Sequence, residues 1–178
     1  MSGIKHKKRA TVILVISVCI VASLSSLLPV ENLFVSFSTP QTVFAYSQSG
    51  HIEDIIEGND SCMVVSSSAS NSFSATIFPK SETGYKIGTY FASEPILSEY
   101  KDGNRIELVR CRGTEDYYTT VFGIAANNSI NISDNCGSDF RNIIFDNAGA
   151  EHKIFFAYSA IDHLGDGYYR RLTEKSSF

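Results

Sequence analysis

The chain has 178 residues, of which 43% are hydrophobic and 19% charged, which is enough apolar material for one ordinary domain with its own core. Its formal net charge is −4 at pH 7. An acidic surface repels phosphate groups, so nucleic acid and anionic lipid surfaces are disfavoured as partners.

The first 45 residues have the charge and hydropathy order of an export signal. Four basic residues and no acid lie within residues 5–9, and the apolar run "ATVILVISVCIVASLSSLLPV" follows directly. Further on, Val43-Phe44-Ala45 fits the pattern that signal peptidase accepts, and we predict cleavage between Ala45 and Tyr46, as in the leaders of Gram-positive bacteria. The alternative is an uncleaved membrane anchor, since residues 10–30 are about long enough to cross a bilayer as a helix.

Cleavage at this position would leave 133 residues with 11 Lys and Arg against 18 Asp and Glu, a formal charge of −7. We therefore divide the chain into a leader at residues 1–45, a linker or first strand at 46–62, and a single domain at 63–178.

Short stretches with strand character follow one another along this domain. In "FSATIF" (73–78) the apolar Phe73, Ala75 and Ile77 alternate with polar residues, the period-two pattern of a half-buried strand. Similar stretches are "GYKIGTYFA" (84–92), "NRIELVRC" (104–111), "YYTTVFGIA" (117–125), "FRNIIF" (140–145), "KIFFAYSA" (153–160) and "GYYRRL" (167–172). Turn signals separate them about every ten to fifteen residues, the spacing of sandwiches and barrels. The pattern predicts an all-β, antiparallel β-sandwich, jelly-roll-like or immunoglobulin-like, after an N-terminal signal or anchor helix.

Two Tyr-Tyr pairs occur after acidic turns, in "EDYYTTVFGIAANNSINIS" and in "GDGYYRRL", with "SDFRNIIFDNAG" and "FFAYSA" between them. Together these pieces, over residues 113–172, resemble the β-sandwich of the bacterial pre-peptidase C-terminal domain family. The resemblance implies a non-catalytic appendage of exported proteins that assists export or holds large substrates.

Three cysteines follow the leader, so at most one internal disulfide can form. Cys111 ends a strand candidate and Cys136 lies in the turn-like "SDNCGSD", and we favour this pair. Two alternatives remain: a bond between Cys62 and Cys111, or three small buried thiols.

Chemistry-bearing residues are few and form no recognisable catalytic motif. In "DHLGDG", Asp162 and Asp166 with a backbone carbonyl offer oxygen ligands for Ca²⁺, and a calcium-free turn is the alternative. No catalytic residue and no other cofactor is assigned. A hydrolase would need loop carboxylates or a Cys-His pair to meet in one pocket, so we ask whether Asp162 and Asp166 converge with His152 and His163.

The sequence therefore favours an exported, non-catalytic binding module of a Gram-positive cell surface or secretome. Its expected partner is a protein or a glycan at the cell surface. It is expected to be secreted and to meet the membrane only through an uncleaved leader. The alternatives are a secreted hydrolase and a structural envelope protein anchored by residues 10–30.

Overall fold

The structure is a computed structural model. It describes residues 11–20, 30–68, 72–88, 92–101, 103–125, 130–146, 153–161, 164 and 170–174. Residues 11–20 form a short helix, and the 3₁₀ helix η1 (Val30–Leu33) and the α-helix α2 (Pro40–Ser47) precede the strands. Over these ranges, no helix combines the length and the apolar character needed to cross a membrane.

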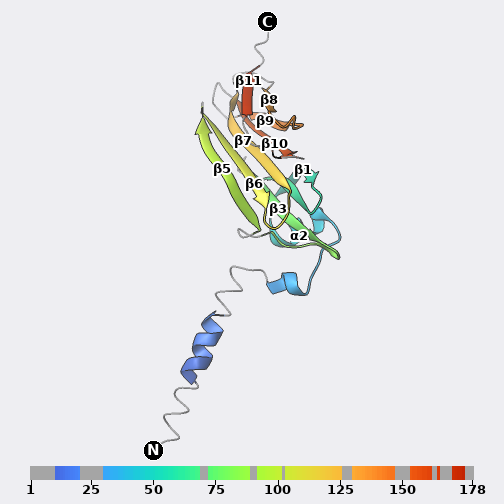
Figure 1. Cartoon of the computed structure of the whole chain (residues 1–178), viewed down its shortest axis with the longest axis vertical. Coiled ribbons are helices and arrows are strands. Elements are labelled where there is room, and N and C mark those ends of the chain that lie inside the picture. The colour runs from blue at the N-terminus through green and yellow to red at the C-terminus, as the bar shows by residue number, and fades with distance from the viewer. Residues whose placement is uncertain are drawn as a thin grey trace, which may run out of the picture.

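Within the described residues, eleven strands build two main antiparallel sheets and a two-stranded ribbon. Figure 1 shows their arrangement. The four-stranded sheet has the order β1 (His51–Glu57), β2 (Ser61–Ser67), β3 (Phe73–Ser81) and β4 (Gly84–Tyr85). The five-stranded sheet has the order β5 (Ser93–Lys101), β6 (Asn104–Cys111), β7 (Tyr117–Ala125), β10 (Lys153–Ile161) and β9 (Arg141–Asp146). The ribbon pairs β11 (Arg170–Glu174) with β8 (Ile130–Asp134). The prediction of an all-β, antiparallel, sandwich-like architecture is confirmed.

The main core lies between the two sheets. Every second residue of a strand contributes to it, because successive side chains of a strand point to opposite faces. Its buried members are Ile56, Met63, Val65, Ile77, Cys111, Tyr118, Phe156 and Tyr158. In the first tyrosine pair Tyr118 is 1% exposed, whereas the hydroxyl of Tyr117 reaches the Glu115 carboxylate at the surface. One ring of the pair thus fills the core and the other faces outward.

Each main sheet also buries part of its other face. Beyond the five-stranded sheet a second cluster contains Ile106, Val121, Ala125, Ile132, Phe155 and Ala157, to which β8 contributes Ile132. On the outer face of the four-stranded sheet, α2 packs Val43 and Phe44 against Cys62, Val64 and Phe78. The four-stranded sheet is thus covered on both faces.

The expected domain boundaries fall inside regular structure. The segment at 46–62, expected to be a linker or a first strand, contains strand β1. The expected domain start at residue 63 lies inside β2. The predicted cleavage point between Ala45 and Tyr46 lies inside α2, whose Val43 and Phe44 belong to a buried cluster.

Candidate binding cleft beside strand β3

A cleft of about 740 Å³ lies between β3 and the inner face of β6 and β7. From β3 it is lined by residues 73–77, and from the opposite sheet by Arg105, Glu107, Tyr118 and Phe122 among others. The wall from the five-stranded sheet combines rings with an ion pair, whereas β3 contributes the side chains of Phe73 and Ile77 and main-chain groups between them. The cleft therefore offers both apolar surface and hydrogen-bonding groups.

A row of aromatic and cationic side chains crosses the wall formed by the five-stranded sheet. The registers pair Tyr100 with Arg105, Arg105 with Phe122, and Phe122 with Phe156. Directly opposite residues of antiparallel strands share a face, so these four side chains lie side by side. Tyr100 is 77% and Phe122 42% exposed, whereas Phe156 is buried. The row thus runs from the core out to solvent.

The charged pair of the cleft lies next to this row. Arg105 Nη2 donates a hydrogen bond to Glu107 Oε1 at 2.5 Å, and the two side chains are 64% and 34% exposed. Exposed ion pairs of this kind contribute about 0–1 kcal/mol. Their loss or rearrangement therefore costs the fold little, which leaves the pair available to reorient toward a bound molecule.

The rim of the cleft is the edge of β3. The Lys80 amide donates to the Asp60 carbonyl on the β2 side, and the Lys86 amide donates to the Pro79 carbonyl on the opposite side. The N–H and C=O groups of successive strand residues point in opposite directions. Those of the odd-numbered residues of β3 therefore point away from β2. Strand β4 pairs with β3 only at Lys80 and Ser81.

Past β4 the chain stays against β3 as far as Gly88. A Cβ added at Gly88 would lie 2.0 Å from the Ile77 carbonyl oxygen, so only glycine permits this approach. Further along β3, and within the part of the chain that the structure describes, the outward main-chain groups of Phe73 and Ala75 meet no paired strand. Ser74 and Ala75 are exposed. Among the described residues, the cleft is therefore bordered by a short stretch of the β3 edge that has no paired strand.

Aromatic stacking holds the end of this edge in place. The ring of Phe73 stacks on Phe145 with 4.6 Å between centroids, and on Phe156 with 6.0 Å. Offset ring pairs of this kind contribute about 0.5–1.5 kcal/mol beyond the area they bury. Since Phe145 and Phe156 belong to the opposite sheet, this stack fixes the width of the cleft at one end.

A buried carboxylate network supports the floor at the other end. Asp116 accepts hydrogen bonds from the Asn59 amide at 3.0 Å, the Asp60 amide at 2.8 Å and the Ser61 hydroxyl at 2.7 Å. The Ser61 hydroxyl also lies 2.9 Å from the hydroxyl of Tyr118, whose pKa is raised mainly by burial. This network ties the β1–β2 turn to β7. Asp116 therefore has a structural role beneath the cleft.

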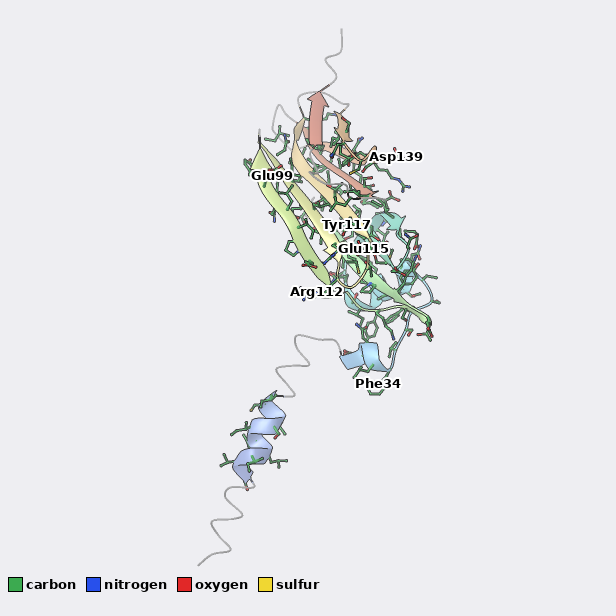
Figure 2. The ribbon with its side chains drawn as sticks, in the orientation of Figure 1. Phe34, Glu99, Arg112, Glu115, Tyr117 and Asp139 are labelled. Atoms are coloured by element: carbon green, nitrogen blue, oxygen red, sulfur yellow. The ribbon has the colours of Figure 1, made fainter. Side chains whose placement is uncertain are left out.

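The other acidic groups do not gather at the cleft. Figure 2 shows Glu99, Glu115 and Asp139 in separate parts of the domain. Asp54, on β1, pairs with Arg141 at 2.9 Å and accepts a hydrogen bond from Tyr158 at 3.1 Å, which joins the two sheets. Within the described ranges no three His, Cys, Asp or Glu side chains are grouped so as to hold a metal ion.

None of the described residues that the sequence singled out as candidate site residues lines the cleft. The proposed Ca²⁺ ligands Asp162 and Asp166, with His152 and His163, fall outside the described residues. Cys111 and Cys136 are free thiols, as is Cys62, so the favoured disulfide is not present. Cys111 faces the core between the sheets, whereas Cys136 follows β8, whose Ile132 packs on the opposite side of the five-stranded sheet.

Sequence reasoning did not identify the cleft residues. Arg105 and Glu107 are two apart on a predicted strand and so share a face, which was a usable signal. Their proximity to Phe122 and to the β3 edge depends on strand pairing, which one sequence does not reveal.

Known families, curated proteins and solved structures were each searched, and no match to this chain was found. The resemblance to pre-peptidase C-terminal domains therefore stays a prediction.

Proposed function

We propose that the chain is an exported, non-catalytic binding domain whose cleft holds an extended peptide segment of a surface protein. The observation that supports this proposal is the stretch of the β3 edge beside the cleft that no described strand pairs with. An extended peptide can add a strand to such an edge, with main-chain hydrogen bonds providing affinity and alternate side chains providing specificity.

The residue composition of the β3 edge favours the addition of a peptide strand. Exposed strand edges are usually blunted by charges, proline or bulges, because they attract other strands. The outer strand β5 has these features, with Pro95 next to a register shift and Glu94 and Glu99 along it. In contrast, β3 presents the small, uncharged Ser74 and Ala75 at the cleft. An unblunted edge beside an aromatic wall is suited to a strand-like partner.

The two walls suggest how such a peptide lies. Alternate side chains of a strand added at Phe73–Ala75 point toward the five-stranded sheet, where Phe122 and Tyr118 provide apolar contact. The Arg105–Glu107 pair can meet polar groups of the peptide at the mouth of the cleft. The acidic balance of the chain favours neutral or basic segments. A glycan has no regular ladder of N–H and C=O groups and would leave the β3 edge unpaired.

The proposal includes the finer features expected from the sequence. These are export by the N-terminal leader, location at a Gram-positive cell surface, an immunoglobulin-like or jelly-roll-like class, and a role like that of pre-peptidase C-terminal domains. The order of basic residues before the apolar run supports export. The absence of catalysis is supported by the structural roles of Asp116 and Asp54, which are hydrogen-bonded within the fold.

A displayed library of random nine-residue peptides provides the test, with selected peptides measured by isothermal titration. Ala75→Pro removes an outward N–H without touching the β2 ladder, and proline is tolerated at such edge positions. We expect this variant to bind selected peptides at least about tenfold more weakly. The control, Ala75→Ser, keeps the N–H and is expected to bind as the parent does.

N-methylation of a selected peptide gives an independent readout. Strand addition predicts that methylation weakens binding at every second position only, because alternate amides face the β3 edge. Equal binding by Ala75→Pro and the parent would refute edge pairing. If no peptide is selected and the protein binds cell-wall polysaccharide instead, the peptide proposal is overturned and the ligand is a glycan.

A further inference from the structure

Residues 32–47, here named the strap, lie between the N-terminal apolar run and the first strand. They pair with the end of the four-stranded sheet. The Asn32 side chain donates to the Ile87 carbonyl at 2.9 Å and accepts from the Ile87 amide at 2.7 Å. The amide of Phe37 donates to the Tyr85 carbonyl at 2.9 Å, and the Tyr85 amide donates back at 2.8 Å. The strap thus extends the β4 edge with four hydrogen bonds.

The hairpin that receives the strap is shaped for it. Lys86 Nζ donates to the carbonyls of Asn32 at 2.9 Å and Val35 at 3.0 Å, and to Ser36 Oγ at 2.8 Å. Gly84 has φ +128, and a Cβ there would lie 2.4 Å from the Phe37 carbonyl oxygen. A side chain at position 84 would collide with the strap. Lys86 and Gly84 of the hairpin therefore make close contacts with residues that precede the predicted cleavage point.

Helix α2 then carries the strap across the outer face of the sheet. Thr39 caps the helix through its reciprocal hydrogen bonds with Thr42, and Pro40 occupies its first turn. Val43 is 0% and Phe44 3% exposed. The Phe44 ring meets Phe78 edge-on at 6.5 Å. Loss of residues 1–45 would uncover Cys62, Val64 and Phe78, each of which is fully buried.

We propose that the strap stays on the exported protein as the first element of its domain. The chain is then not cleaved between Ala45 and Tyr46, and any processing lies N-terminal to Asn32. The Val43-Phe44-Ala45 pattern that resembles a cleavage signal is instead part of α2, in which Val43 and Phe44 are buried. This inference goes beyond the proposed function; it rests on the export proposed there, but not on the binding of a peptide in the cleft.

The test is the N-terminus of the protein after export, using the full chain in a Gram-positive host. Intact mass is measured on the membrane fraction and on the medium. The expected N-terminus lies at or before Asn32, and an uncleaved chain counts as support. A start at Tyr46, or anywhere from residue 33 onward, would overturn the inference.

A substitution that does not disturb the fold sharpens this test. Ala45 is exposed on α2, so Ala45→Leu leaves the buried face intact, yet it removes the small residue that signal peptidase requires before its cleaved bond. We expect the mass of the exported protein to change only by the substitution itself. If the parent is cut after Ala45, the variant will instead appear as a longer chain, which also overturns the inference.

Discussion

Replacement of Phe44 by alanine measures how much the strap contributes to the stability of the domain. Phe44 is 3% exposed and packs against Phe78, Cys62 and Val64. Truncation of a buried phenylalanine costs about 3–5 kcal/mol, from lost transfer energy and the cavity left behind. Because α2 has only 8 residues, it has little stability of its own and depends on this packing. We expect a loss of about 3 kcal/mol or more, a large part of the 5–15 kcal/mol typical of a domain.

Urea unfolding of the full chain in mild detergent, followed by tyrosine fluorescence because the sequence has no Trp, checks this value. The matched control is Tyr46→Ala on the same helix. Tyr46 is 60% exposed and contacts only the ring of Phe37 among the described aromatic side chains, with centroids 5.1 Å apart. Its loss is expected to cost about 1 kcal/mol or less. Equal effects of the two substitutions would refute the reasoning that α2 belongs to the core.

Two further predictions concern titrating groups. Iodoacetamide at neutral pH should modify Cys136 well before Cys62 or Cys111, because burial raises the pKa of Cys62 to about 12 and also raises that of Cys111. Peptide mapping checks the order, and a Cys136 that stays unlabelled until reductant is added would instead indicate the disulfide. Burial opposes ionisation of Asp54, but hydrogen bonds led by that from Arg141 outweigh it and lower its pKa. Its contribution is therefore complete above its unfolded pKa of about 3.9 and is lost as pH falls through the lower folded value. Melting temperatures from pH 6 to pH 2 should fall less steeply in Asp54→Asn, and a parallel fall in both proteins would contradict this.

The strands were predictable because their signal is local. Alternation in "FSATIF" placed Phe73 and Ile77 on one face, and both pack toward the five-stranded sheet. The Tyr117-Tyr118 pair divides between surface and core as the period of two requires. Such patterns depend only on neighbours in the chain.

The strap and the cleft were not predictable in this way. In the sequence, Val43 and Phe44 are apolar residues close behind the apolar run at residues 10–30. Only their contact with Phe78, far along the chain, distinguishes a packed helix from the end of a signal peptide. Arg105 comes to lie beside Phe122 through pairing between β6 and β7. A one-residue change in the pairing of β6 with β7 would place the side chains of Arg105 and Phe122 on opposite faces of the sheet.

The hydrogen bonds between Asn32 and Ile87 have a mechanical consequence. Ile87 immediately precedes Gly88, which lines the cleft and lies against Ile77 of β3. Tension applied to the chain N-terminal to Asn32 is therefore borne first by the residues that flank the cleft. Such tension acts on the wall of the cleft before it reaches the interior of either sheet, so the mechanical strength of this attachment and the peptide binding proposed for the cleft depend on the same few bonds.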